Sequence, residues 1–368
     1  MKILELTNYS SGICGVWARV KEEANRLSKN HEVMVFSSDR IKGENGTAIS
    51  EEKIGKVKIK RFKAKNLGGE SFMSWAFEKE AIKFHPDIII AHSYRHIHTL
   101  RALLVARKIK ARVFLVTHAP FERTGSRGQK GNIIVYFYDQ FVGRITLSKF
   151  NKVLSITKWE KPHLLNLGLS EKNISYIPNG IPEEFFTQKR SKEENRILFL
   201  GRIAPIKNLE VLIKSVQYIE NKKIKLELVG PEEKEYSNFL KKLVKDLNLS
   251  DRIIFSKPIY KTKEKIEKID SARIFVLPSK SEGMSQSLIE AMAREKIVIA
   301  SDNKASTDLI EDGKNGLIFS TYNEKDLAEK INKALSGKLN NIRKEAKKSV
   351  EKFDWKEILK KIEDLLGP

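Results

Sequence analysis

The sequence PSKSEGMSQSLIEAMA, at positions 278–293, follows an apolar run over Ile274–Leu277 that has the length and composition of a buried strand. We expect a turn at Glu282 and Gly283, because glycine leaves the backbone free, and then a helix over Ser285–Arg294. The first amides of a helix that follows such a turn bind phosphate readily. The stretch therefore predicts an α/β fold with an anion site after this strand.

The same alternation of short apolar runs and helix-length segments extends through all 368 residues. Nearly continuous apolar strands joined by helices indicate parallel sheets covered on both faces. The polar tract TQKRSKEEN at 187–195 marks a join between two such sheets. We predict two Rossmann-like, doubly wound domains facing each other across a cleft, residues 1–186 and 187–353, with a C-terminal helix (354–368) packed back on the first.

The expected elements follow from these patterns. Strands are expected at Lys2–Leu6, Glu32–Phe36, Val57–Arg61, Asp87–Ala91, Val113–Thr117, Val153–Ile156, Ile174–Ile177, Arg196–Leu200, Lys225–Val229, Arg252–Phe255, Ile274–Leu277, Ile297–Ala300 and Leu317–Phe319. Helices are expected at Val16–Ser28, Phe72–Phe84, Ile97–Ile109, Asn208–Ile219, Tyr236–Leu247, Ser285–Arg294, Glu324–Ser336 and Trp355–Leu366.

Composition narrows the class of protein. No stretch reaches the ~18 consecutive apolar residues of a membrane span, and the start MKILELTN has the pattern of a strand rather than of a secretory signal. A single cysteine, Cys14, excludes an internal disulfide framework and indicates a reducing compartment, so we expect a cytoplasmic protein. The net charge of +22 favours anionic partners without choosing among them.

Two cations follow the strand that opens the second half. Arg202 comes directly after Gly201 at the strand end, and Lys207 stands five residues later at the start of a helix. Together they can neutralise a diphosphate without a metal ion. The alternative is that both are solvated surface residues.

Glu290 lies about two turns after Glu282, in the helix body, where its carboxylate can accept both hydroxyls of a ribose. The alternative is two surface glutamates, one of them favoured by the N-terminal end of the helix. In the first half, a glycine-containing loop before Val16 includes Gly15 and opens another helix. That loop suits an anion or is a plain tight turn, and it lacks the glycine spacing of a dinucleotide site.

These segments together resemble the family-four glycosyltransferases of the GT-B fold. The resemblance covers nearly the whole chain, and its motifs occur in the family's order. They are Gly15-Val16 with His31-Glu32-Val33, Pro86-Asp87 with Ala91-His92, Thr117-His118, Pro178-Asn179-Gly180-Ile181, Gly201-Arg202 with Lys207, Val229-Gly230, Glu282 to Glu290 with Ala291-Met292-Ala293, and Asp312-Gly313 with Asn315-Gly316.

The chain departs from the family pattern at several positions. Cys14 and Asn30 stand where the family has glycine, and Arg294-Glu295-Lys296-Ile297 replaces the pattern x-G-x-P. The segment 304–308 replaces a glycine-rich loop that lies near the donor in the family. The resemblance therefore implies an altered donor pocket or reduced activity.

The resemblance also implies residue roles. Arg202 and Lys207 would stabilise the departing diphosphate, Glu290 would hold the ribose, and Glu282 the donor sugar. His118 would contact the sugar near the reacting carbon, and His92 would line the acceptor cleft. The donor-binding set is Gly15, Arg202, Lys207, Glu282, Gly283, Met284, Ser285, Gln286, Ser287 and Glu290, with backbone amides of Gly15, Gln286 and Ser287 facing the phosphates.

No metal or other cofactor is expected. The chain has no D-x-D, the metal motif of the other glycosyltransferase fold. His92 and His96 are four residues apart, but no third ligand accompanies them. His98 and His163 are expected at the surface. The family retains anomeric configuration, by front-side attack in which the donor phosphate takes the acceptor proton.

Half of the net charge lies between His92 and His163, where fourteen Lys or Arg stand against three acids, a net +11. Apolar residues are interleaved with this charge, notably Ile133, Ile134, Tyr136, Phe137 and Phe141. Such a mixture suits an anionic membrane surface and a lipid-linked acceptor. The alternative is that the apolar residues are core and the charges a solvated face.

The sequence thus predicts a retaining, metal-independent transferase that moves a hexose or N-acetylhexosamine from a UDP- or GDP-linked donor to a hydroxyl of a glycan or lipid-linked acceptor. A sugar-nucleotide epimerase and a phosphorylase fit the motifs less well. An inactive nucleotide-sugar-binding subunit is the main alternative. A basic nucleic-acid-binding protein is a further alternative, but no recognisable reader motif is present, so we expect no nucleic-acid partner.

Overall fold

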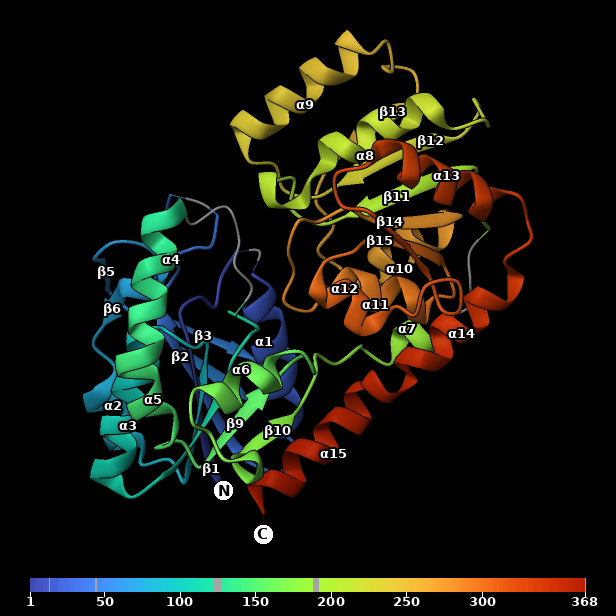
Figure 1. Cartoon of the computed structure of the whole chain (residues 1–368). Helices are drawn as coiled ribbons and strands as arrows, with labels where there is room; N and C mark the ends of the chain where they lie inside the picture. Colours follow the sequence, from blue (N-terminus) through green and yellow to red (C-terminus); the bar gives the residue numbers. More distant parts are fainter. Residues whose placement is uncertain (13, 44, 122–127, 188–191, 368) are drawn as a thin grey trace. The chain divides into compact units, whose positions relative to one another are not determined.

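The computed structural model describes the chain except for residues 13, 44, 122–127, 188–191 and 368. The chain forms two compact units, each with its own parallel sheet (Figure 1). Unit 1 comprises Met1–Asn179 and Ile358–Pro368, and unit 2 comprises Gly180–Glu357. The predicted fold class, two doubly wound parallel-sheet α/β units, is confirmed.

Unit 1 is built on an eight-stranded sheet in the order β10-β9-β8-β7-β1-β2-β4-β3, parallel except for the β3–β4 pair. The order changes direction between β1 and β7, and doubly wound sheets bind ligands at the carboxyl ends of such strands. The strands are β1 (Lys2–Thr7), β2 (Glu32–Ser38), β3 (Glu51–Ile54), β4 (Val57–Phe62), β7 (Ile88–His92), β8 (Arg112–Val116), β9 (Lys152–Ser155) and β10 (Ile174–Tyr176).

The central strands form because their side chains are apolar on both faces, as the run Ile88, Ile89 and Ile90 shows with every member fully buried. Helices cover the sheet and return the chain to its amino-terminal edge. They are α1 (Gly15–Leu27), η1 (Glu70–Phe72), α2 (Glu78–Phe84), α3 (Ile97–Ile109), α4 (Gly128–Phe137), the π-helix η3 (Tyr138–Gly143), α5 (Arg144–Leu147), α6 (Glu160–Asn166) and η4 (Glu171–Asn173).

One predicted helix in unit 1 is wrong. The segment Phe72–Phe84 is helical only from Glu78, and its first part forms strand β6 (Met73–Trp75), which pairs antiparallel with β5 (Ala64–Asn66). Met73 and Trp75 are buried while Ser74 between them is partly exposed, which is the two-residue period of a strand. The short strands β3, β5 and β6 were not expected from the sequence.

Unit 2 has a six-stranded, fully parallel sheet in the order β13-β12-β11-β14-β15-β16. Its order changes direction between β11 and β14, which gives this unit a switch point of its own. The strands are β11 (Arg196–Leu200), β12 (Lys225–Val229), β13 (Ile253–Ser256), β14 (Ile274–Leu277), β15 (Ile297–Ser301) and β16 (Leu317–Phe319).

Helices cover both faces of the unit 2 sheet, with α8 and α13 on one face and α10, α11 and α12 on the other (Figure 1). The helices are α7 (Glu184–Thr187), η5 (Pro205–Lys207), α8 (Leu209–Ser215), η6 (Val216–Tyr218), α9 (Lys234–Asp246), α10 (Thr262–Ser271), α11 (Gln286–Ala293), α12 (Lys304–Leu309), α13 (Glu324–Leu335), α14 (Asn340–Val350), η7 (Glu351–Phe353) and α15 (Trp355–Leu366).

Helix α15 begins in unit 2, where the indole of Trp355 covers Gly180, and its residues from Ile358 onward belong to unit 1. A Cβ atom at Gly180 would lie 2.3 Å from the Trp355 ring, so only glycine fits there. In the described part of the chain, none of the helices has the length and apolar character that crossing a membrane requires.

Candidate active site

The switch point of unit 2 brings the two chemistry-bearing motifs of this unit together. Arg202 and Lys207 follow β11, and Glu282 follows the neighbouring strand β14. A backbone hydrogen bond of 2.9 Å from Lys280 N to Ile206 O joins the two loops. Residues 75 positions apart in the sequence are therefore neighbours at the carboxyl edge of the sheet.

Lys207 and Glu282 form the centre of this edge. Lys207 Nζ lies 2.5 Å from Glu282 Oε1, and Ser279 Oγ donates to the same oxygen at 2.6 Å. The side chains of Lys207 and Glu282 are only 17% and 11% exposed, so solvent screens their attraction less than at an open surface. The structure thus places a cation and a carboxylate, predicted to serve diphosphate and sugar, in one partly buried pair.

Arg202 lies on the adjoining loop and is more open. Its guanidinium pairs with Glu233 Oε1 at 3.1 Å, and the side chain is 47% exposed. The turn that carries it depends on Gly230, whose φ is +152° and whose Cβ, if present, would lie 1.9 Å from Gly201 O. The Val229-Gly230 motif therefore has a steric purpose, because it lets two strand ends approach at the site.

The helix after Glu282 positions the rest of the predicted donor set. Ser285 is the N-cap residue of α11, and Gln286 Nε2 donates to Gly180 O at 2.9 Å. The hydroxyls of Ser285 and Ser287 lie 3.4 Å apart, Met284 is buried, and Gly283 is partly exposed. The backbone amides of the first turn of α11 thus begin directly after the Glu282 turn.

Glu290 is buried in the body of α11 and forms an ion pair with Lys265 of α10. Lys265 also lies 5.9 Å from the centre of the Phe185 ring. Sequence reasoning did not identify Lys265, because nothing in its local pattern distinguishes it from the many other lysines of the chain. Any ligand hydroxyl held by Glu290 would meet this lysine as well.

The segment that replaces the family's glycine-rich loop is a short helix. Asn303 caps α12 by accepting a hydrogen bond from Ser306 N at 3.0 Å. Its amide group also donates to Ser279 O at 2.9 Å, and Ser301 Oγ donates to the same carbonyl at 2.5 Å. Asn303 and Ser301 therefore support the loop that holds Glu282, and neither residue was predicted from the sequence to belong to the site.

A second departure from the family pattern serves packing. Arg294 makes two buried hydrogen bonds to the Asp270 carboxylate, at 2.8 and 2.7 Å, and a third to Phe185 O at 3.0 Å. Lys296 Nζ donates to the carbonyls of Asp270 and Ala272 at 2.8 and 3.0 Å. Buried cations need such partners. The hydrogen bonds of Arg294 connect the end of α11 to α10 and α7.

In unit 1, Gly15 is the first residue of α1, and a Cβ atom there would meet nothing within 4 Å. Cys14, the N-cap position before it, has extended backbone and makes no side-chain cap hydrogen bond. Both residues follow β1, on the carboxyl edge of the unit 1 sheet. The predicted phosphate contact at Gly15 therefore lies at the edge of the sheet where doubly wound folds bind ligands.

His92 and His118 lie together at the same edge of unit 1. His92 ends β7, His118 follows β8, and His92 Nδ1 is 3.0 Å from His118 Nε2. The other nitrogen of His92 lies 2.6 Å from Glu5 Oε2, and the His92 side chain is fully buried. His92 therefore has both ring nitrogens engaged inside the protein, while His118 is partly exposed.

Burial controls the protonation of this group. It lowers the pKa of His92 to about 4 and that of His118 well below its ordinary range, and it raises the pKa of Glu5 to about 8. His98, expected at the surface, is instead buried, because its Nε2 bonds His92 O at 2.8 Å. The expectation for His98 was wrong because the first turn of α3 packs against the end of β7, where the His92 carbonyl is the partner of the ring.

A buried carboxylate from α6 fixes the turn that carries His118. Glu160 accepts hydrogen bonds from Ala119 N at 3.0 Å, from Ile156 N at 2.8 Å and from Thr157 N at 3.0 Å, and also from the Thr117 hydroxyl. His118 and Ala119 have positive φ values of 59° and 51°, a conformation that costs non-glycine residues energy. Glu160 offsets that cost by holding both sides of the turn.

The helices α4, η3 and α5 display an apolar surface. Ile133, Ile134, Tyr136, Phe137, Phe141 and Ile145 are each 54–65% exposed. The opposite side is anchored, since Arg95 and Tyr94 bond Asp139 at 2.8 and 3.0 Å and Gly143 packs against Tyr94. The alternative in which these apolar residues form core is therefore wrong, and we call these six residues the apolar face.

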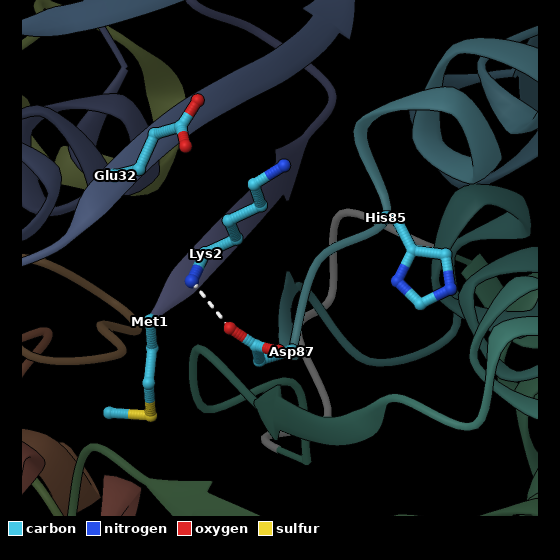
Figure 2. A pocket seen from close by; sticks show the side chains of 5 residues that line it. All are labelled: Met1, Lys2, Glu32, His85 and Asp87. Carbon is cyan, nitrogen blue, oxygen red and sulfur yellow. Dashed lines mark hydrogen bonds between the residues drawn. The ribbon is translucent and has the colours of Figure 1, made fainter.

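Other features lie away from these residues. A hollow of about 620 Å³ opens at the amino-terminal edge of the unit 1 sheet, where Lys2 N donates to Asp87 Oδ2 at 2.7 Å (Figure 2). Its described lining residues include none of the predicted site residues; they are Met1, Lys2, Glu32, His85 and Asp87. Within the described residues, no group of three or more His, Cys, Asp or Glu side chains is arranged to hold a metal ion.

Two family models match the chain almost end to end. The model described as Glycosyltransferase Family 4 matches residues 13–185, and the model described as Glycosyl transferases group 1 matches residues 180–353. The chain is also 26% identical to an uncharacterized glycosyltransferase of Methanocaldococcus jannaschii, over 96% of this chain and 94% of that protein.

Two further proteins illustrate what the chain is similar to. An alpha-monoglucosyldiacylglycerol synthase of Streptococcus pneumoniae is 25% identical over 89% of this chain and 76% of that protein. The structure of Anabaena HepE in complex with UDP and glucose superposes with a TM-score of 0.75 at 17% identity, over 100% of this chain and 99% of that one. At that identity the superposition shows the fold alone.

Proposed function

We propose a function from the premise that the chain belongs to the GT-B glycosyltransferases of family 4 and group 1. The chain transfers a hexose or N-acetylhexosamine from a UDP- or GDP-linked donor to a hydroxyl of a lipid-linked or glycan acceptor. The transfer retains the anomeric configuration of the sugar. In this proposal unit 2 binds the donor and unit 1 binds the acceptor. The observation that carries it is the Lys207–Glu282 pair at the unit 2 switch point, with Arg202 on the adjoining loop.

The pair supports donor binding on electrostatic grounds. As the sugar leaves, negative charge grows on the diphosphate, and preorganised cations in a partly buried site stabilise it strongly. Arg202 and Lys207 supply that charge, and the first amides of α11 supply hydrogen-bond donors. Glu282 then holds the sugar, Glu290 the ribose, and His118 contacts the sugar near the reacting carbon.

With two cations assigned to the diphosphate, the mechanism we propose needs no metal ion. The acceptor hydroxyl attacks on the face from which the diphosphate departs, and a phosphate oxygen takes its proton, which preserves the anomeric configuration. Activity should therefore persist in EDTA. Strict dependence on added Mn²⁺ or Mg²⁺ would contradict this part of the proposal.

A lipid-linked acceptor is supported by the apolar face. Exposed apolar side chains enter the membrane interface, and basic residues near an anionic surface add on the order of 1 kcal/mol each. Arg144 and Lys149 stand next to the apolar face in the sequence and are exposed, and Arg107 and Lys108 are exposed on α3. The similar pneumococcal protein is named for the synthesis of a glucosyldiacylglycerol, which is itself a glycolipid. We place the enzyme at the cytoplasmic side, since its single cysteine suits a reducing compartment.

Flotation with vesicles tests the membrane part of this proposal. Wild-type chain should float with phosphatidylglycerol vesicles and not with neutral phosphatidylcholine vesicles. Phe137→Ser with Phe141→Ser should reduce binding even at low salt, and Arg107→Glu with Lys108→Glu should reduce it mainly by charge. Tyr260→Ser, which removes an exposed aromatic from unit 2, is the matched control.

If the wild-type chain stays in solution with anionic vesicles at low salt, the acceptor is soluble. Binding to duplex or single-stranded nucleic acid with a steep salt dependence would instead favour the nucleic-acid alternative.

A catalytically weak nucleotide-sugar-binding subunit is the second candidate, because α12 occupies the segment where the family has a glycine-rich loop near the donor. A thermal-shift screen against UDP, GDP, ADP and their sugars tests donor binding for both candidates. A ligand at about 100 times its dissociation constant should stabilise the chain by roughly 2.7 kcal/mol. No shift with any nucleotide would refute both.

A further inference from the structure

A row of three side chains crosses the carboxyl edge of the unit 1 sheet. Glu5 Oε2 lies 2.6 Å from His92 Nε2, and His92 Nδ1 lies 3.0 Å from His118 Nε2. The first two side chains are fully buried, and the third is partly exposed. Among the described residues no group hydrogen-bonds the remaining nitrogen of the row, His118 Nδ1.

Hydrogen-bond accounting allows this row two arrangements when both imidazoles are neutral, because a neutral imidazole has one donor and one acceptor nitrogen. If Glu5 carries a proton, it donates to His92 Nε2, His92 Nδ1–H donates to His118 Nε2, and His118 Nδ1 carries a proton. If Glu5 is ionised, every bond reverses, and His118 Nδ1 becomes an acceptor.

We propose that Glu5 and His92 are positioning residues that set whether His118 presents a hydrogen-bond donor or an acceptor to the ligand of this edge. Resting on the proposed function, this ligand is the sugar or phosphate of the donor. A proton on Nδ1 would let His118 donate to a hydroxyl or phosphate oxygen. His92 would then act through His118, rather than by touching the acceptor.

The surroundings of Glu5 favour the protonated arrangement. Its second oxygen, Oε1, is buried and has no hydrogen-bond partner among the described residues, and an ionised carboxylate left in that state is costly. Burial raises the pKa of Glu5 to about 8, although the nearby Arg19 acts to lower it. At neutral pH Glu5 therefore donates, and the row ends in His118 Nδ1–H.

Arg19 and Glu23 of α1 are the charged groups that act on Glu5, and they pair with each other, while Arg19 Nη2 and Glu23 Oε1 have no hydrogen-bond partner among the described residues. Arg19 Nε bonds Glu23 Oε2 at 3.1 Å, and Arg19 Nη1 donates to the carbonyls of Ile177 and Pro178, both at 3.0 Å. Burial and the neighbouring Glu5 raise the pKa of Glu23. The other titratable groups at the row are His92 and His118 themselves and His96, whose pKa burial lowers to about 4.

The ring at the end of the row is held in place. Glu160 fixes the strained turn of His118 and Ala119 from one side, through Thr117 and Ala119 N. The bond to His92 fixes the imidazole from the other side. The direction of Nδ1 is thus set by the fold, and the only quantity left to Glu5 is where the proton sits.

Nitrogen-15 NMR of the imidazole rings in the full-length chain, without any nucleotide sugar, measures directly which nitrogen of His118 carries the proton. Long-range couplings tell which ring nitrogen carries the proton, and the seven histidines are assigned by the signal lost in variants such as His118→Asn. At pH 6.5 we expect His118 protonated on Nδ1. Above about pH 9 the proton should move to Nε2. A proton on Nε2 at pH 6.5 would overturn the proposal.

The variant Glu5→Gln provides a second test, because its amide can donate to His92 Nε2 and cannot ionise, so the row has no pH-dependent switch. His118 should then keep its proton on Nδ1 from pH 6.5 to 9.5. Glu363→Gln is the matched control, since it alters a glutamate–histidine pair with His31, 2.8 Å apart, that is not connected to the row. A tautomer switch in Glu5→Gln like that of the wild type would also refute the proposal.

Turnover provides a separate reading. If the chain is a transferase, wild-type activity should fall above about pH 8 and Glu5→Gln should lose less activity there. If no donor is turned over under any condition, the proposed function fails, while the NMR result still decides the role of the row.

Discussion

The switch point of unit 2 and the buried row of unit 1 each combine a glutamate with basic side chains, but they differ in charge and in exposure to solvent. The unit 2 group uses two cations that follow β11, Arg202 in a loop and Lys207 at the end of η5, with partners that are partly open to solvent. The unit 1 row uses two fully buried side chains, Glu5 and His92, and the partly exposed His118. Within the described part of the chain, His118 Nδ1 alone among the ring nitrogens of the row has no partner. Cations that are open to solvent can bind an incoming anion, whereas a buried neutral row can act only by setting the position of the proton on its last residue, His118.

The first prediction concerns the unit 2 cations, where we expect the largest effect on turnover. We expect Arg202→Ala and Lys207→Ala each to lower turnover at least tenfold, that is, by ~1.4 kcal/mol or more of transition-state stabilisation, because each meets charge that develops on the leaving group. Lys263→Ala, which removes an exposed cation of the same unit, is the control and should change little. Wild-type kinetics in both site variants, with the fold intact, would refute the assignment.

A smaller effect separates the two glutamates of unit 2. Glu290→Ala should weaken binding of free UDP or GDP by roughly five- to tenfold, since it removes hydrogen bonds of about 1 kcal/mol to the ribose. Glu282→Ala should weaken the nucleotide sugar by a similar factor and spare the diphosphate. Titration calorimetry with both ligands checks this. Tight UDP and GDP binding by Glu290→Ala would show that the ribose is held elsewhere.

The third effect concerns stability rather than turnover or ligand binding, and it belongs to the unit 1 row. Because the pKa of Glu5 is raised from 4.5 to about 8, the folded chain keeps a proton that the unfolded chain loses, so stability falls as pH rises between these values. One such group contributes a slope of at most ~1.4 kcal/mol per pH unit. Glu5→Gln should flatten this part of the curve.

Urea unfolding of wild type and Glu5→Gln at pH 5, 6.5 and 8 measures that slope. On the acid side, the lowered pKa of His92 acts in the other direction. Stability is lost as pH falls from 6.5 towards about 4, and Glu5→Gln should leave that loss in place. Equal slopes for both proteins between pH 5 and 8 would show that Glu5 is ionised in the folded chain.

The two regions also differ in how well the sequence predicts them. The strands of unit 2 were predicted closely, Arg196–Leu200 and Leu317–Phe319 among them, because buried parallel strands are short continuous apolar runs between helices. Arg202, Lys207 and Glu282 were singled out because they stand in the segments that follow β11 and β14. Local pattern predicted the strands, whereas the roles of these residues came from the family resemblance and stay predictions.

Prediction failed where pairing across the sheet decides the structure. The strand Met73–Trp75 follows apolar residues that also fit a helix, and only its pairing with Ala64–Asn66 makes it a strand. Glu5 lies inside a buried strand, and the residues next to it in the sequence do not indicate that β7 and β8 bring two histidines to the same edge of the sheet. Lys265 and Glu160 likewise have their partners on other elements, Glu290 on α11 and the turn after β8, which local sequence does not reveal.

The most direct test of the central claim is the fate of a labelled donor. Wild type and Lys207→Ala are each incubated in EDTA with radiolabelled UDP- and GDP-linked sugars and anionic vesicles that carry extracted glycolipids. We expect wild type to release the nucleoside diphosphate and move label to an acceptor or to water, and Lys207→Ala to do so at least about ten times more slowly. Donor that binds wild type and stays intact would contradict the account, and would identify the chain as a nucleotide-sugar-binding subunit.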